Sequence, residues 1–185
     1  MKKYYILYKP FLIFLAKFFL SYAVLTIIYH IFLNQYDVTK NENDRLTEIV
    51  ASQTENVITF FGYESETQPH ESEPSVKLFV NQKYVARVVE GCNAVSVMIL
   101  FVAFIIAFKG KLLTTIVFAI LGCLFIHVLN IIRIALLAIA LLHYPEYQHI
   151  LHGVIFPLII YGIVFLLWVI WVNKFSVYAK TTSEG

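Results

Sequence analysis

Three residues that can catalyse acyl transfer together lie in separate parts of the chain: Cys92, Arg133 and His152. A cysteine thiolate is a strong nucleophile, and a nearby imidazole or cation favours it over the thiol. Histidine can take the thiol proton and later protonate a leaving amine, because imidazole titrates near neutral pH. Arginine presents fixed N–H donors that can stabilise the oxyanion of a tetrahedral intermediate. These residue types together are typical of a cysteine peptidase or transpeptidase.

The composition indicates where such chemistry would take place. Of the 185 residues, 59% are hydrophobic and only 14% are charged, whereas soluble domains average about 45–50% apolar and about 25% charged residues. This balance argues against a water-soluble enzyme, a nucleic-acid-binding protein and a disordered chain. Two cysteines are too few for a disulfide framework. The chain is therefore predicted to be an integral membrane protein.

Four apolar stretches are candidates for membrane-spanning helices, each of which needs about 20 residues. They cover residues 10–33, 91–108, 112–142 and 153–172. The basic start Met1-Lys2-Lys3 also fits a signal peptide, but the first stretch is too long and no small-residue cleavage pattern follows it. Trp168 and Trp171 are expected to anchor the end of the fourth span at the interface.

The third stretch is too long for one ordinary span, because it has 31 residues. Its first part, to about Asn130, is expected to cross the bilayer. Residues 131–142 are expected to continue this helix or to form a short bent helix at the outer interface.

The placement of the lysines orients the spans. One cluster precedes the first span, a second joins the second span to the third, and a third follows the fourth span: Lys2, Lys3 and Lys9; Lys109 and Lys111; Lys174 and Lys180. The positive-inside rule then predicts that both termini are cytoplasmic. Residues 34–90 would lie outside, and this segment holds ten of the twelve acidic residues.

The outer segment has two structured parts by its pattern. Apolar residues recur at helical spacing from Leu46 to Phe61 and Gly62 follows them, which predicts an amphipathic helix over residues 41–61 along the membrane surface or on the outer helix ends. Residues 63–75 are expected to be a polar linker. Residues 76–80 and 83–89 are predicted to form a β-hairpin around Asn81-Gln82.

The predicted organisation therefore has four parts. They are residues 1–33 (cytoplasmic start and first span), 34–90 (extracytoplasmic helix and hairpin insert), 91–173 (catalytic transmembrane core) and 174–185 (cytoplasmic tail). The fold class is an all-α polytopic membrane protein with four transmembrane helices and a small helix-plus-β-hairpin insert.

The three reactive residues are predicted to share one membrane face. Cys92 would open the second span at its outer end, and His152 would open the fourth. Arg133 lies 22 residues beyond Lys111, which is roughly 33 Å at about 1.5 Å per residue. By the same reasoning Cys123 lies near mid-bilayer, too deep to form a disulfide with Cys92.

Neighbouring polar residues could support this cluster. Asn130 shares a helix face with Arg133, because the two are three residues apart. His149 is three residues before His152 and is an alternative acid/base, and Glu90 lies two residues before Cys92.

Each residue also has an explanation that involves no catalysis. A lone cysteine in a membrane helix is usually an apolar filler, arginine can snorkel to headgroups, and histidine often lies at the interface. Glu90 could simply mark the water boundary, and His127 with Asn130 and Arg133 could form an ion or proton relay. No compact metal-ligand spacing such as HExxH or paired CxxC is present, so we predict no metal and no cofactor.

Three short blocks resemble the signatures of the exosortase/archaeosortase family. They are Val89-Glu90-Gly91-Cys92-Asn93-Ala94, Asn130-Ile131-Ile132-Arg133-Ile134 and Leu151-His152-Gly153. The layout is most similar to the short exosortase F type. The resemblance implies a membrane-embedded cysteine transpeptidase with Cys92 as nucleophile, Arg133 as transition-state stabiliser and His152 as general acid/base.

The resemblance also implies partners and a location. The substrate would be an exported protein with a C-terminal sorting signal, made of a short motif, a transmembrane helix and a basic tail. The protein would lie in the bacterial cytoplasmic membrane, act on its extracytoplasmic side, contact lipid and work with or without a small membrane partner protein, and it would bind no nucleic acid. The alternatives are a non-catalytic scaffold or assembly subunit of an envelope export system, and an ion or proton transporter that depends on His127.

Overall fold

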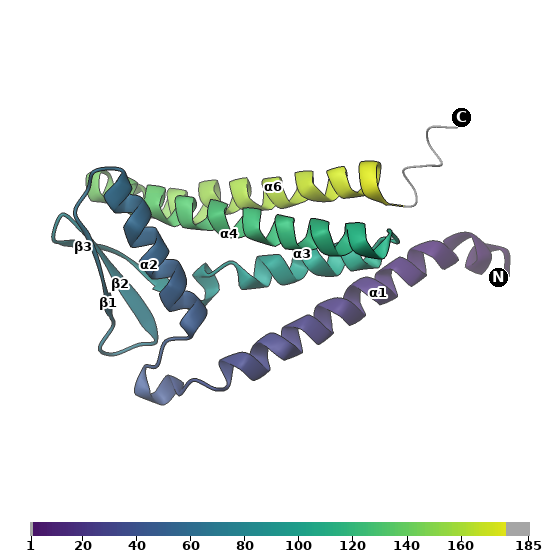
Figure 1. Ribbon diagram of the computed structural model, residues 1–185, viewed down its shortest axis with the longest axis horizontal. Coiled ribbons are helices and arrows are strands. Elements are labelled where there is room, and N and C mark those ends of the chain that lie inside the picture. Colours follow the sequence, from purple (N-terminus) through teal and green to yellow (C-terminus); the bar gives the residue numbers. More distant parts are fainter. Residues whose placement is uncertain (1, 177–185) are drawn as a thin grey trace. The chain divides into compact units, whose positions relative to one another are not determined.

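Long apolar helices make up most of the chain. The computed structural model describes residues 2–176 (Figure 1). Met1 and residues 177–185 lie outside the described residues, and so does Lys180, which was assigned to the lysine cluster after the fourth span. Three helical stretches are long and apolar enough to cross a membrane: Tyr8–Leu33 within α1 (Lys2–Leu33), α4 (Leu112–His143) and the run Pro145–Phe175. The last run comprises η3 (Pro145–Tyr147), α5 (Gln148–Ile150), η4 (Leu151–Ile155), α6 (Phe156–Ile170) and η5 (Trp171–Phe175).

The second predicted span is shorter than expected. The helix α3 covers Val95–Ala107, which is 13 residues, or about 20 Å of helix against a hydrocarbon layer of about 30 Å. Residues 91–94 do not belong to it, because η2 (Glu90–Cys92) is a separate 3₁₀ turn and Ala94 has a left-handed backbone with φ 63°. The expectation that Cys92 opens a transmembrane helix is therefore wrong.

The chain divides into two compact units. The first comprises residues 1–32, 96–124 and 163–185. Aromatic rings pack its helices together: Phe104 lies 4.3 Å from Trp168 and 5.8 Å from Phe14, measured between ring centroids. Trp171 is fully buried and packs on Phe118, so the prediction that it anchors the interface is wrong.

The second unit comprises residues 33–95 and 125–162 and contains a three-stranded antiparallel sheet in the order β1-β2-β3. The hairpin of β2 (Ser75–Val80) and β3 (Lys83–Val89) confirms the prediction. Asn81 and Gln82 both have positive φ, as a two-residue hairpin turn requires.

The prediction that residues 63–75 form only a polar linker is wrong, because this segment contains the strand β1 (Ser65–Pro69). This strand has no apolar alternation because it forms a sheet edge and pairs with β2 through its backbone, from Ser65 opposite Val80 to Pro69 opposite Val76. Thr67 also donates a hydrogen bond to Glu55 of the neighbouring helix at 2.5 Å. Backbone pairing and polar side-chain contacts thus order a segment whose composition is that of a loop.

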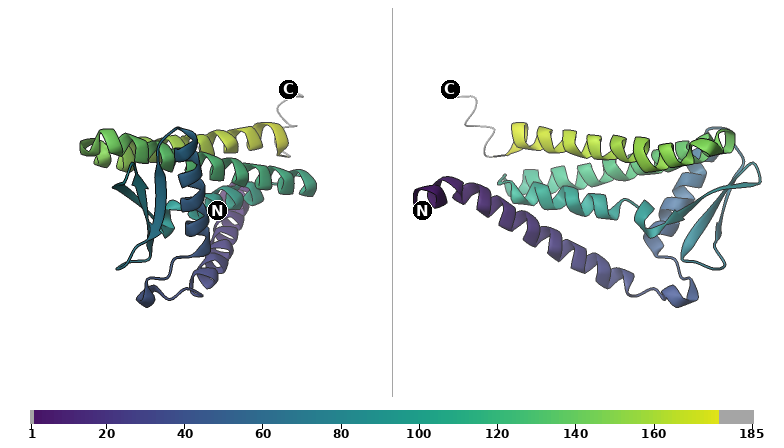
Figure 2. Two further views of the ribbon diagram at one scale, coloured as in Figure 1. Left: turned by 60° about the vertical axis from the view of Figure 1, so that its left-hand side comes forward. Right: turned by 180° about the vertical axis from the view of Figure 1, so that it is seen from behind.

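The helix α2 (Arg45–Phe60) covers one face of this sheet, as Figures 1 and 2 both show; the short turn η1 (Val38–Lys40) precedes it. Its side chains Val50, Ala51 and Ile58 are buried against the sheet, whereas Phe60 at its end remains 87% exposed. The predicted amphipathic helix therefore exists, and its buried face packs on protein.

The long helix α4 is one helical element over Leu112–His143. Three of its residues beyond Asn130 belong to the buried core that α2 and the sheet share: Ile134, Ala135 and Ala138. The extra apolar length of the third stretch is thereby explained, because its second part is covered by the insert and not only by lipid.

Candidate active site

Cys92 ends a tight turn that joins the sheet to α3. Strand β3 runs directly into η2, where the backbone N–H of Asn93 donates to the carbonyl of Glu90 at 3.2 Å. The side-chain oxygen of Asn93 then accepts a hydrogen bond from the backbone N–H of Val95 at 2.9 Å. The half-buried Cys92 packs against the core of the insert. The thiol is therefore carried by an ordered loop, not by the first turn of a helix.

Asn130 links this turn to α4. Its side chain is fully buried, and its Nδ2 donates to the carbonyl oxygen of Cys92 at 2.7 Å. Its Oδ1 accepts a hydrogen bond from Nη1 of Arg133 at 3.3 Å. One amide thus contacts both the backbone of the cysteine and the guanidinium of the arginine, and the contact with Arg133 is the one that the three-residue spacing on one helix face predicts.

Arg133 keeps unused hydrogen-bonding capacity. Its Nε is buried and has no hydrogen-bond partner within residues 2–176, and no carboxylate of that part of the chain forms a salt bridge with it. A buried polar group without a partner is rare and usually has a functional reason or an unseen ligand. The guanidinium is therefore available to a bound anionic or carbonyl group.

A cavity of about 280 Å³ brings the three reactive residues together. Cys92, Arg133 and His152 all line it, and they come from three different elements, η2, α4 and η4. The remaining wall is formed by apolar residues of β3 and α4, by Arg87 and by Gln148. The structure thus places the thiol, the guanidinium and the imidazole around one cavity.

His152 lies in the π-helical turn η4, inside the continuous helical run Pro145–Phe175. The prediction that this residue opens the fourth span is therefore corrected, because the helix begins seven residues earlier at Pro145. A π turn inserts one extra residue into the α-helical register and is frequent at functional sites. Here it carries the imidazole that lines the cavity.

The other supporting residues lie in different positions. His149 lines a separate open pocket with Glu146 and His152, and it does not line the cavity that contains Cys92. Glu90 contributes its backbone carbonyl to the turn that carries Cys92. His127 donates from Nε2 to Oε1 of Gln53 in α2 at 2.8 Å, so its observed contact is with the insert.

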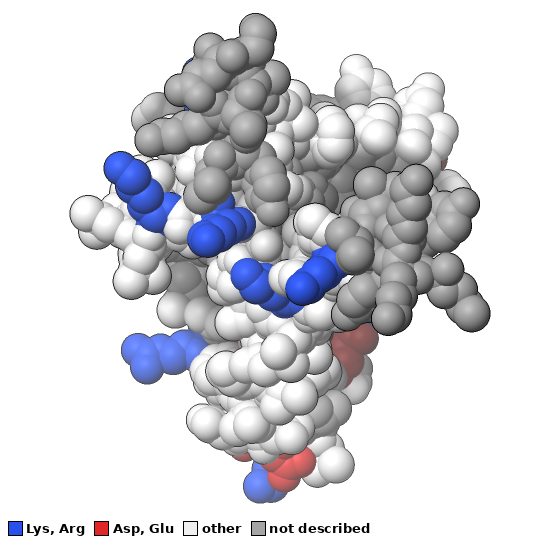
Figure 3. Space-filling model, turned by 90° about the vertical axis from the view of Figure 1, so that its right-hand side faces the viewer, with Lys and Arg blue, Asp and Glu red and all other residues white. Residues whose placement is uncertain are grey.

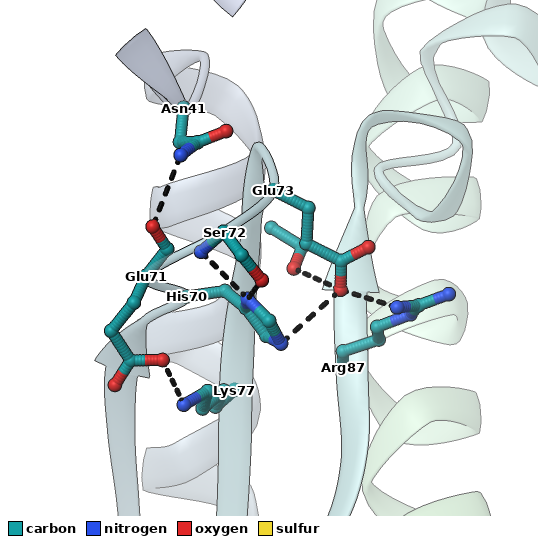
Figure 4. Close-up of polar contacts among 8 residues, drawn as sticks. Asn41, His70, Glu71, Ser72, Glu73, Lys77 and Arg87 are labelled. Atoms are coloured by element: carbon teal, nitrogen blue, oxygen red, sulfur yellow. Dashed lines mark hydrogen bonds and ion pairs between the residues drawn. The ribbon is translucent and has the colours of Figure 1, made fainter.

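Two polar residues of the cavity were not predicted from the sequence, Arg87 and Gln148. Arg87 on β3 forms a short salt bridge with Glu73, which also contacts His70 at 3.4 Å (Figure 4). Desolvation acts to raise the pKa of Glu73, but the hydrogen bond and charge of Arg87 outweigh it and hold this pKa below its ordinary value. The sequence offered one signal for Arg87: it is a basic residue five positions before Cys92, on the predicted strand that leads to the cysteine.

Glu73 belongs to the loop between β1 and β2, and a second set of contacts holds this loop (Figure 4). Lys77 pairs with the carboxylate of Glu71, and this hydrogen bond lowers the pKa of Glu71. Asn41 donates to the backbone carbonyl of Glu71 at 3.0 Å. The loop between β1 and β2 is therefore held in place beside the strand that carries Arg87.

Several apolar helices and a cavity with a cysteine, an arginine and a histidine define a multi-pass membrane protein with a candidate thiol site. The sequence model of the transmembrane exosortase family matches residues 9–171, which is most of the 185-residue chain. The chain belongs to the transmembrane exosortase family. No curated protein and no solved structure matches it.

Proposed function

We propose that this exosortase is a cysteine peptidase or transpeptidase of the short exosortase F type. It processes the C-terminal sorting signals of exported proteins at the outer face of the bacterial cytoplasmic membrane. The observation that carries this proposal is the common cavity of Cys92, Arg133 and His152 in a chain of this family.

The reaction assigns one role to each of these residues. His152 takes the thiol proton as Cys92 Sγ attacks the scissile carbonyl carbon, and the carbonyl oxygen becomes an oxyanion. Arg133 donates hydrogen bonds to that oxyanion, for which its unpartnered Nε is suited. Collapse of the intermediate breaks the C–N bond, His152 returns the proton to the leaving amine, and a thioester remains on Cys92. Water or an amine then attacks the thioester and regenerates the thiol.

The proposed topology has four crossings, with α3 as the short second one. The lysines of the first unit support a cytoplasmic end: Lys109 and Lys111 flank Gly110, which pairs with Ser176 just beyond Lys174. Basic side chains gather at this end of the unit (Figure 3). With this end inside, four crossings place the segment between the first and second crossings, which carries the insert, on the outer side of the membrane.

Thiol labelling tests this orientation. Cys92 is expected to react with a membrane-impermeant maleimide added to spheroplasts, and Cys123 is expected to react at least about tenfold more slowly, because it lies within the apolar helix α4. Single-cysteine variants, Cys123→Ser and Cys92→Ser, allow each rate to be measured alone. Faster labelling of Cys92 from the cytoplasmic side of inverted vesicles would contradict the topology.

A processing assay tests the function itself. A substrate with a sorting signal and a tag at its extreme C-terminus is expected to lose the tag only when the full-length exosortase is co-expressed. The covalent intermediate is expected to run as a chain-plus-substrate adduct that neutral hydroxylamine releases, because hydroxylamine cleaves thioesters. The control is the same substrate without its transmembrane helix and basic tail. Tag loss that does not require the exosortase would refute the proposal.

A further inference from the structure

We propose that the N-terminal end of α2 is a positioning device for Cys92, with Asp44, Thr47 and Asn93 as positioning residues. The catalytic consequence of this inference rests on the function proposed above. The contacts themselves do not, because they are made within the second unit whatever the reaction is. The insert thereby takes part in the chemistry as well as in the fold.

A chain of buried hydrogen bonds connects α2 to the turn of the cysteine. The Oδ2 of Asp44 accepts from the hydroxyl of Thr47 at 2.5 Å, and this hydroxyl oxygen accepts from Nδ2 of Asn93 at 3.4 Å. Asn93 is the residue directly after Cys92. All three side chains are at most 6% exposed, so water does not compete for these bonds.

The link between Thr47 and Asn93 goes beyond what the helix end requires. The Oδ1 of Asp44 already accepts the backbone N–H of Thr47 at 3.0 Å, which is a complete N-cap for α2. The Thr47 hydroxyl is not needed for that cap. Its contact with Asn93 therefore serves the turn on the other side.

The backbone beside the nucleophile needs such support. Ala94 has φ 63°, a left-handed conformation that is unfavourable for a residue with a Cβ. Strained residues of this kind persist where the surroundings hold them, and they cluster at functional sites. Asn93 spans this residue, because its Oδ1 holds the N–H of Val95 while its Nδ2 is held by Thr47.

The turn is thus held from two helices at once. Asn130 of α4 binds the carbonyl of Cys92 itself, and Thr47 of α2 binds the next side chain. Two independent anchors on adjacent residues fix the position and orientation of the thiol. Without the anchor on α2, the thiol would still lie at the cavity, but its position would be less restricted. A displacement of about 1 Å can lower the reaction rate about 100-fold.

Two buried threonines of the same helix provide a matched test. Thr47→Val is expected to lower kcat for substrate processing by about tenfold or more, with KM changed by less than about threefold. Thr54→Val removes an equally buried hydroxyl whose hydrogen bond, among residues 2–176, is to the carbonyl of Val50 within α2, and it is expected to leave kcat within about twofold. Thr47→Ser keeps the hydroxyl and is expected to restore most of the rate.

A second measurement does not depend on any substrate. Amide hydrogen exchange of the full chain in nanodiscs is expected to become faster in the peptide over residues 90–96 for Thr47→Val and to stay unchanged there for Thr54→Val. Unchanged exchange in Thr47→Val, or equal kcat losses in both valine variants, would overturn the inference. Faster exchange without a fall in kcat would also overturn it, whereas a wild type that processes no substrate would count against the proposed function alone.

Discussion

Replacement of Cys92 by alanine is expected to abolish loss of the C-terminal tag from the substrate, with a fall in rate of at least about 1,000-fold. The physical reason is that no other thiol lines the cavity with Arg133 and His152. Without Sγ there is no atom to form the thioester, and the hydroxylamine-sensitive adduct should disappear as well. The measurement is the size shift of the tagged substrate in cells, followed by immunoblot.

Cys123→Ala is the matched control for this experiment. It removes the second thiol of the chain and is expected to leave processing within about twofold, because Cys123 does not line the cavity. Normal processing by Cys92→Ala at wild-type protein levels would contradict the proposed catalytic function. It would favour the alternative of a non-catalytic scaffold or assembly subunit. That alternative also predicts sensitivity to changes in the insert with no sensitivity at Cys92.

The second large effect is expected at His152. His152→Ala should reduce processing by at least about 100-fold, because general acid–base catalysis contributes about 100- to 10,000-fold. His149→Ala is the control from the same helical run, one turn earlier. It is expected to retain most of the activity, since His149 lines the neighbouring pocket and not the cavity of Cys92.

The double variant Cys92→Ala/His152→Ala adds a further check. It should be no slower than Cys92→Ala alone, because residues that act as one catalytic unit are strongly non-additive. If His149→Ala stops processing and His152→Ala does not, the acid/base assignment is wrong. If neither change slows processing, general acid–base catalysis by this helical run is wrong.

Much of the fold could be predicted from local pattern. The apolar stretches became helices, and the turn residues Asn81 and Gln82 between two apolar strands marked the hairpin correctly. The pairing of Asn130 with Arg133 followed from helix geometry alone. Each of these features depends on residues that are close together in the sequence.

The features that were missed depend on distant partners. The start of α3 is set by Ala94 and by contacts of Asn93 with Thr47, 46 residues away. Strand β1 is ordered by backbone pairing, which its polar sequence does not reveal. Arg87 lines the cavity because residues of its strand and of α4 form the same wall, and no periodicity of single residues predicts that arrangement.

The hydrogen bond from Asn130 to the carbonyl of Cys92 has a consequence for the biogenesis of the protein. The two residues are 38 positions apart, so a ribosome working at about 5–20 residues per second makes the asparagine roughly 2–8 s after the cysteine. During that interval the hydrophobic core of the insert is also incomplete, because Ile134, Ala135 and Ala138 of α4, which belong to it, have not been synthesised. The thiol is therefore synthesised before the arginine and the histidine, and the cavity that all three line can form only after the later helices have been made.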